Sequence, residues 1–269
     1  NYLNLCLAMG IGLLISQMKI NKHPLPIKQL IIDILESLLS NKIILRLCLI
    51  IIVCGLVLTK SRMGNIAFFS ALAIISLYGF FFYKNKPQQL KLLIVSFFVL
   101  DLVIVGGLIG IGEVKDRLSN TSFVEETRDE VYRDSILIIL DKPILGSGGG
   151  SFYTAFPAYQ SEVILGHYDN AHNDYIQFAA ELGLPVSILL GCLLIYLLFL
   201  CLNIISTSNC NFQKGIAFGC ITSILMMLIH STVDYSLQSG ANSITFIAIL
   251  ATLLNVSKLK SDVKKRRRQ

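Results

Sequence analysis

The chain has 269 residues, of which 54% are hydrophobic and 15% are charged. A soluble domain is nearer about 25% charged, so this composition excludes a soluble globular protein and indicates an integral membrane protein. The formal net charge is +6, but Lys258–Arg268 alone carries seven Lys and Arg against one Asp. After a hydrophobic segment, such a tail is more typical of a cytoplasmic membrane anchor than of a nucleic-acid partner.

Apolar runs of about 17–25 residues predict an all-α, polytopic membrane protein. Seven membrane-spanning helices are expected, at Tyr2–Met18, Ile43–Thr59, Asn65–Tyr83, Leu92–Gly112, Leu182–Ile205, Gly215–Thr232 and Gly240–Leu254. The chain starts at Asn1 inside the first run, without the charged segment that opens a signal peptide. We therefore expect one membrane domain over residues 1–269 that is the C-terminal fragment of a longer chain.

The connections between these spans predict their orientation. Basic residues concentrate in Lys19–Lys42, Lys84–Lys91, Ser206–Lys214 and the tail at 257–269. Alternation of seven spans places all four on one side, and the positive-inside rule makes that side cytoplasmic. The opposite side then receives Lys60–Gly64, a long loop at 113–181 and Asp234–Ser239. The long loop is acidic, with twelve Asp and Glu against five Lys and Arg.

One apolar segment has the pattern of an amphipathic helix rather than of a span. In Ile27–Ser40 the apolar residues share one helical face, and Gln29, Asp33 and Glu36 lie opposite. The segment follows Pro24 and Pro26, which can start a helix. A helix in the inner membrane interface and a packed cytoplasmic helix both fit this pattern.

The polar interruption from Thr127 to Glu181 holds most of the residues suited to chemistry. Arg128 and Arg133 lie on or beside a helix predicted at Val131–Leu140, which Asp141, Lys142 and Pro143 close. A glycine cluster that includes Gly148 follows and would let the backbone approach a ligand. The GK[ST] ending of a P-loop is absent, and a bare glycine cluster is more typical of a turn than of a phosphate cradle.

Two histidines follow the glycine cluster, His167 and His172, the second opening the run HNDYIQ that contains Asn173. Histidine is the side chain best suited to accept a proton near neutral pH, although a histidine in a loop is commonly structural or solvated. Their spacing matches no HExxH zinc site, and no pair of the seven cysteines has metal-ligand spacing, so no metal site is expected. Glu181 either caps the following span or orients a neighbour.

Two further polar groups lie at predicted membrane ends. Arg62 stands in the tight turn Lys60–Gly64, where it either snorkels to the surface or binds an anionic lipid headgroup through its paired donors. His230 and Asp234 are four residues apart, so helical spacing predicts that they share a face. They either face a polar cavity or form a buried pair that holds two helices together.

Four elements in order give the chain a resemblance to the O-antigen ligase and O-antigen polymerase superfamily of bacterial envelope glycosyltransferases. SRMG at Ser61–Gly64 resembles an S-R-x-G element, and Arg128 stands fifteen residues before Pro143 in a pattern of arginine, helix and P-[IL]-L-G-x-G. His172–Gly183 resembles H-N-x-[YF]-[IL]-Q-x-x-x-E-x-G, and His230–Asn242 resembles H-S-x-x-D-[FY]-x-L-Q-x-x-A-N. Together these elements span roughly two thirds of the chain.

The resemblance implies a GT-C-like glycosyltransferase of the bacterial inner membrane, without cofactor or metal, whose long loop is periplasmic and contains short helices. Such enzymes take a glycan from undecaprenyl pyrophosphate at the periplasmic face. They pass it to a hydroxyl of lipid A core, of another glycan repeat unit or, in some members, of a protein. This chain departs from the family in two ways. The family has about a dozen spans, whereas seven are predicted here, and Tyr132 stands where tryptophan is common.

This resemblance suggests a mechanism for the candidate residues. Arg62 and Arg128 would hold the pyrophosphate, and His172 would accept the proton of the acceptor hydroxyl, with His167 as the reserve base. Further substrate contacts are expected from Arg133, Gly148, Asn173, His230 and Asp234. Two other classes fit less well, namely a lipid-linked glycan transporter and a scaffold subunit of an envelope assembly. A transporter predicts polar residues throughout its spans, and a scaffold gives no reason for arginines and a histidine to converge.

Overall fold

The computed structural model describes residues 1–18, 43–59, 61–82, 123–164 and 166–266. Within these ranges every regular element is a helix, so the all-α prediction is confirmed there. The predicted span Leu92–Gly112 and the amphipathic segment Ile27–Ser40 lie outside the described residues. The chain forms two compact units, the first made of 1–108, 197–226 and 244–269, and the second of 109–196 and 227–243.

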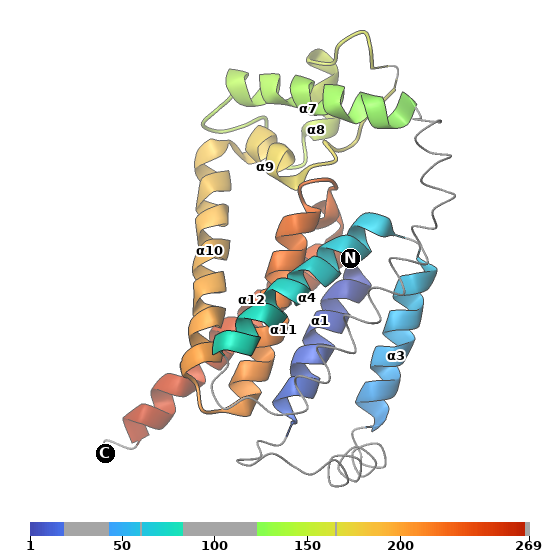
Figure 1. The fold of residues 1–269 in the computed structure, drawn as a ribbon. Coiled ribbons are helices and arrows are strands. Elements are labelled where there is room, and N and C mark those ends of the chain that lie inside the picture. Colours follow the sequence, from blue (N-terminus) through green and yellow to red (C-terminus); the bar gives the residue numbers. More distant parts are fainter. Residues whose placement is uncertain (19–42, 60, 83–122, 165, 267–269) are drawn as a thin grey trace. The chain divides into compact units, whose positions relative to one another are not determined.

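The described part of the first unit consists of helices (Figure 1). Its elements are α1 (Tyr2–Ser16), α3 (Ile43–Leu58), α4 (Arg62–Phe82), the second half of α10 (Leu184–Thr207), most of α11 (Asn211–His230) and most of α12 (Gly240–Arg266). Four helices of the described chain are long and apolar enough to cross a membrane, at Met63–Phe82, Leu184–Thr207, Asn211–His230 and Gly240–Leu259. They correspond to four of the seven predicted spans. The predicted spans nearest the N-terminus form the shorter apolar helices α1 and α3.

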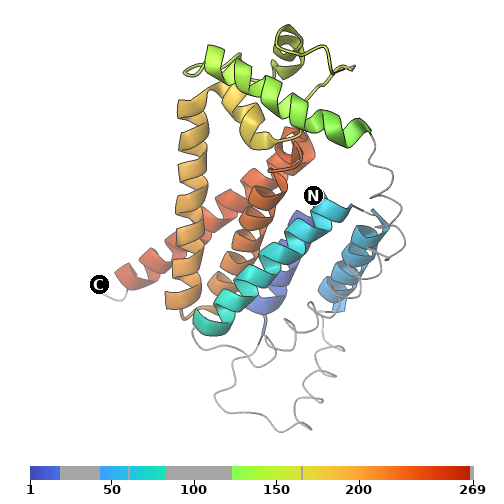
Figure 2. The same ribbon diagram turned by 45° about the horizontal axis from the view of Figure 1, so that its top comes forward.

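Small residues let two of these helices approach closely. Gly12 of α1 lies against Gly215 and Gly219 of α11, and a Cβ on Gly12 would collide with the Gly215 carbonyl oxygen. A Cβ on Gly219 would lie 2.9 Å from the carbonyl oxygen of Ala8. This small-xxx-small packing is typical of membrane helices, where close backbone contact replaces the hydrophobic driving force. Figure 2 shows α1 and α11 side by side from a second direction.

The second unit contains the helices of the polar loop. Its elements are α7 (Phe123–Asp141), α8 (Phe152–Ala155), η1 (Phe156–Ala158), α9 (Asp174–Leu182), the first half of α10 and η2 (Ser236–Gln238). The helix predicted at Val131–Leu140 is confirmed as part of α7. It ends at Asp141, as expected, because Pro143 disfavours helical backbone at the residue before it.

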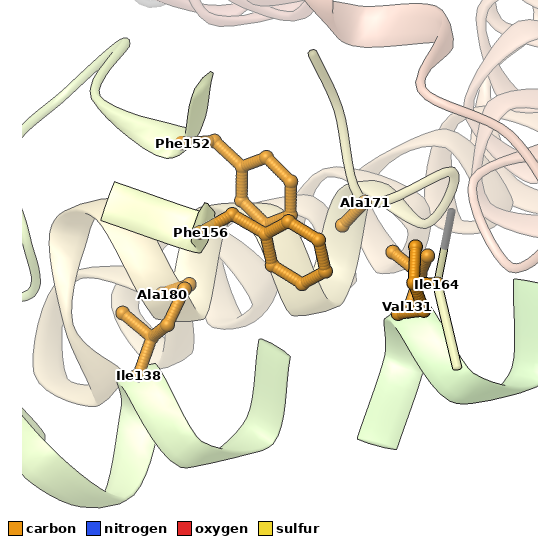
Figure 3. Close-up of a cluster of buried hydrophobic side chains, with 7 residues drawn as sticks. All are labelled: Val131, Ile138, Phe152, Phe156, Ile164, Ala171 and Ala180. Atoms are coloured by element: carbon orange, nitrogen blue, oxygen red, sulfur yellow. The ribbon is translucent and has the colours of Figure 1, made fainter. Parts of the chain in front are cut away.

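A compact apolar core holds these short helices together (Figure 3). Its fully buried members are Val131, Ile138, Phe152, Phe156, Ile164, Ala171 and Ala180. Phe152 and Phe156 stack with their ring centroids 5.0 Å apart. The core thus joins one face of α7 to α8, η1 and α9, and it gives the polar side chains around α9 a fixed frame.

Candidate active site

His172 stands at the start of α9 with an unusual backbone. Its φ angle is 52°, in the left-handed region that non-glycine residues seldom adopt. Its carbonyl oxygen accepts a hydrogen bond from the hydroxyl of Tyr132 on α7, at 2.9 Å. Such a conformation costs free energy and persists where neighbouring contacts fix it, and strained residues of this kind cluster at functional sites.

The His172 ring lies among tyrosines from separate segments. The Tyr235 ring meets it edge to face with centroids 4.8 Å apart, and the Tyr168 ring lies 6.1 Å away in the same geometry. His172 itself is half-buried. The imidazole is therefore held in a defined orientation while part of it stays accessible.

Asn173 starts α9 and joins it to the turn after α11. Its side-chain oxygen accepts from the backbone N–H groups of Tyr175 at 3.0 Å and Ile176 at 3.2 Å, which is the arrangement of a helix N-cap. Its side-chain amide donates to the carbonyl oxygen of Thr232 at 3.0 Å. The residue after His172 is thus fixed from both sides.

Asp174 is buried and accepts hydrogen bonds from that same turn. The donors are the Ser231 hydroxyl at 2.8 Å, the Leu237 backbone N–H at 3.1 Å and the Gln238 side-chain amide at 3.4 Å. Burial raises the pKa of Asp174, and these hydrogen bonds offset part of the rise. The elements His172–Gly183 and His230–Asn242 therefore form one network, because Ser231 bonds to Asp174 across 57 residues of sequence.

His230 and Asp234 lie near each other, but not for the predicted reason. The predicted span continued to Thr232, whereas α11 ends at His230, so Asp234 follows in a turn and shares no helical face with it. His230 Nδ1 lies 3.8 Å from the Asp234 carboxylate and only 2.8 Å from the Ser236 hydroxyl. The buried histidine thus ties the end of α11 to η2.

Glu181 organises the other end of α9. Its buried carboxylate accepts from the backbone N–H groups of Gly150 at 2.8 Å and Phe152 at 3.1 Å. Gln177, one turn earlier, donates to the same carboxylate at 3.3 Å. Of the two roles open to Glu181 in the sequence, the structure shows that it orients a neighbour, namely the glycine cluster.

That cluster packs against the C-terminal end of α9. A Cβ on Gly146 would collide with the Glu181 carbonyl group, and a Cβ on Gly183 would collide with the Ile144 carbonyl oxygen. Both glycines have positive φ, at 66° and 79°. The Gly148 N–H donates to the Glu181 carbonyl oxygen at 2.9 Å, so a substrate contact of Gly148 stays a prediction.

Two predicted site residues have exposed side chains. Arg133 forms an ion pair with Glu130 on its own helix, with the charged atoms 2.9 Å apart. His167 lies beside the Tyr153 ring, with centroids 6.4 Å apart. Their predicted roles in the site stay predictions.

The two predicted pyrophosphate-binding arginines lie on helices. Arg62 is the first residue of α4, in the first unit, and Arg128 lies on α7, in the second. Their side chains lie outside what the structure describes. Convergence of these arginines on His172 therefore stays a prediction.

Sequence reasoning gave no role to three residues of the network beside His172, namely Asp174, Ser231 and Tyr235. A signal was present for Asp174, because an acidic residue directly after an Asn cap favours a helix start. Its partners come from another segment, and no local pattern predicts that pairing. In the described part of the chain, no group of three His, Cys, Asp or Glu side chains could hold a metal ion.

The described helices and the polar network indicate a helical membrane protein with a candidate site on its polar loop. A family model described as O-antigen ligase matches residues 47–191, and the chain belongs to this family. Comparison with curated proteins and with solved structures gave no significant match. The matched residues include Arg62, Arg128 and His172 and end before His230. Family membership indicates a membrane protein for glycan transfer of the O-antigen ligase or polymerase kind, with lipid-linked glycan and acceptor partners.

Proposed function

We propose that this chain transfers a glycan from undecaprenyl pyrophosphate to an acceptor hydroxyl at the periplasmic face of the bacterial inner membrane. The acceptor would be lipid A core, another glycan repeat unit or a protein. The observation that carries the proposal is the fixed position of His172. In this chain, which belongs to the O-antigen ligase family, His172 has left-handed backbone and is held by α7, α9 and the 231–238 turn.

His172 would act as the general base. As the acceptor oxygen forms a bond to the anomeric carbon, a His172 ring nitrogen takes the hydroxyl proton. The bond between that carbon and the pyrophosphate oxygen breaks, and its electron pair leaves with the lipid pyrophosphate. The attack comes from the side opposite the leaving group, so the transfer inverts the anomeric configuration.

Arg62 and Arg128 would stabilise the leaving group. Negative charge develops on the pyrophosphate as the bond breaks, and a guanidinium offers paired donors and a permanent positive charge. Two such groups can supply the charge stabilisation that a metal ion supplies elsewhere. We therefore propose transfer without a metal, which undiminished activity in excess EDTA would support.

The test uses a strain that lacks its own enzyme, complemented with the wild-type chain, His172→Ala or His167→Ala. His172→Ala should abolish glycan transfer at normal membrane levels, and His167→Ala tests the reserve base. Full transfer by His172→Ala would remove the proposed base. A chain that moves lipid-linked glycan equally well without His172 would instead act as a transporter.

The lipopolysaccharide pattern of a deletion strain separates the two family activities. Loss of all long chains from lipid A core, with accumulation of lipid-linked polymer, indicates a ligase. Core that carries a single repeat unit indicates a polymerase. Both patterns agree with glycan transfer, and an unchanged pattern contradicts a role with either acceptor.

A further inference from the structure

The second unit carries an exposed apolar stripe on a helix of its polar loop. Ile136, Leu137 and Leu140 are exposed on α7, and Leu140 has 70% of its surface accessible. The opposite face of α7 is already used, because Val131 and Ile138 lie in the buried core. An outward stripe of large apolar side chains is costly in water and marks an interaction surface.

The stripe continues into the turn that follows α7. Ile144 and Leu145 are 69% and 83% exposed. The turn is fastened to the start of α10, since the Leu184 N–H donates to the Pro143 carbonyl oxygen at 2.8 Å. Gly183 packs directly against the Ile144 carbonyl group. Ile144 and Leu145 therefore lie beside the first turn of α10.

That first turn is where a membrane span begins. Leu184–Thr207 is the most apolar of the four candidate spans in the described chain, with mean hydropathy 2.8. Exposed apolar residues, including Ile188 and Leu189, follow within its first two turns. The stripe on α7 is thus joined through the turn to the exposed apolar surface of a candidate membrane span.

We propose that α7 lies in the membrane interface and inserts Leu140, Ile144 and Leu145 among the lipids of the leaflet where α10 begins. A helix with one apolar face commonly lies about 5–10 Å deep at the boundary of headgroups and acyl chains. Charge along the stripe agrees with this orientation. The exposed Asp129 and Arg133 precede its apolar residues, and the exposed Asp141 and Lys142 separate Leu140 from Ile144, which keeps the helix at the depth of the polar headgroups.

This position has a consequence that rests on the proposed function. Arg128 lies on α7 eight residues before Ile136, about 12 Å along the axis at about 1.5 Å per residue. A helix in the interface keeps that position at headgroup depth, where the pyrophosphate of a lipid-linked donor lies. The membrane contact itself does not depend on the activity, and it is tested without donor or acceptor.

The chain contains no tryptophan, so a single introduced one reports its own surroundings. The full chain is placed in vesicles of phosphatidylcholine with brominated acyl chains, as Leu140→Trp, Leu145→Trp, Ile188→Trp or Glu162→Trp. Ile188 in α10 is the lipid-facing control and the exposed Glu162 is the water-facing control. Bromine should remove most of the emission at positions 140, 145 and 188 and little at position 162.

Two results would overturn the proposal. If aqueous acrylamide quenches positions 140 and 145 as readily as position 162, and bromine does not, the stripe faces water. If neither quencher acts there, protein covers the stripe, either from another part of this chain or from a second copy. Ile144→Trp repeats the measurement should Leu140→Trp fail to fold. Adding His172→Ala to each tryptophan variant should abolish transfer and leave the tryptophan quenching unchanged.

Discussion

Each end of α9 holds a buried carboxylate, and the two carboxylates are bound in different ways. Glu181 accepts mainly from backbone N–H groups of one nearby loop, at Gly150 and Phe152. Asp174 accepts from two side chains and one backbone group of a segment about 60 residues further along the chain. At the C-terminal end of α9, the Glu181 carboxylate thus holds the backbone of the glycine loop, and this contact is called the latch. The N-terminal end is a junction of distant elements, and His172 stands at that junction.

This difference separates scaffold from site. At the latch, glycines and a carboxylate fix the path of the chain, so changes there should act on folding. At the junction, side chains hold a histidine in a strained conformation, so changes there should act on transfer before they act on stability. The following variants test that separation.

Glu181→Ala should give the largest loss of stability. Hydrogen bonds to a charged group are worth about 1.5–3 kcal/mol each, and the variant leaves the Phe152 N–H buried without its acceptor. We expect about 3 kcal/mol of destabilisation in thermal unfolding of the purified chain, from these same bonds. The exposed Glu162→Ala is the control. Normal stability together with lost transfer would place Glu181 in the chemistry.

Gly183→Ala should follow. The substitution forces positive φ on alanine and drives its Cβ into the Ile144 carbonyl, with a strain cost of about 1–3 kcal/mol or more. Gly166→Ala is the matched control, because a Cβ there meets nothing within 4 Å. Equal melting temperatures for the two variants would show that the latch does not constrain the loop.

Asn173→Ala tests the junction. Loss of the helix cap should cost about 1 kcal/mol, and transfer per folded molecule should fall further because the cap adjoins His172. Asn173→Asp keeps the capping oxygen and loses only the donor to Thr232, so it should retain the helix and separate the two contacts. A variant that loses stability but transfers at the wild-type rate per folded molecule would make the junction a scaffold as well.

Asp174→Asn should have the smallest effect, and it depends on pH. Burial raises the pKa of Asp174 above the ordinary value of 3.8, so the fold binds this proton more tightly than the unfolded chain does. That contribution to stability is complete below the ordinary pKa and is lost as pH rises through the raised one. The stability of the wild type relative to the variant should therefore fall from about pH 4 upward in urea unfolding. A difference that is constant with pH would contradict the raised pKa.

The variant is expected to fold because its environment can adapt. The Asn oxygen can accept from Ser231 and Leu237, and the Gln238 amide can turn to present its oxygen to the new NH₂ group. Both bonds to the 231–237 segment are then kept, and only the titration is removed.

Local features of this protein could be predicted from sequence, because local physics decides them. The end of α7 at Asp141 follows from Pro143, and four spans follow from apolar length. The glycine cluster was readable as a turn. That this turn packs against the C-terminal end of α9 could not be predicted, because only the folded backbone shows which carbonyl groups lie beside Gly146 and Gly183.

The candidate site shows the same limit. His172 could be selected by residue type and by its motif, but its left-handed backbone and the tyrosines around it depend on tertiary contacts. The proximity of His230 and Asp234 was predicted from helical spacing, and it is achieved instead by a turn that places Ser236 nearer. Spacing alone therefore found a pair of residues but not the geometry that joins them.

Glycan transfer in vitro tests whether His172 is the general base. The purified full chain in lipid nanodiscs is given an undecaprenyl-pyrophosphate-linked glycan and an acceptor, and transfer is timed for wild type, His172→Ala and His167→Ala. Loss of a general base should slow His172→Ala about 10²–10⁴-fold, with unchanged melting temperature, whereas a loss confined to His167→Ala would move this role to the reserve base. Transfer by His172→Ala at the wild-type rate would show that His172 is not the base.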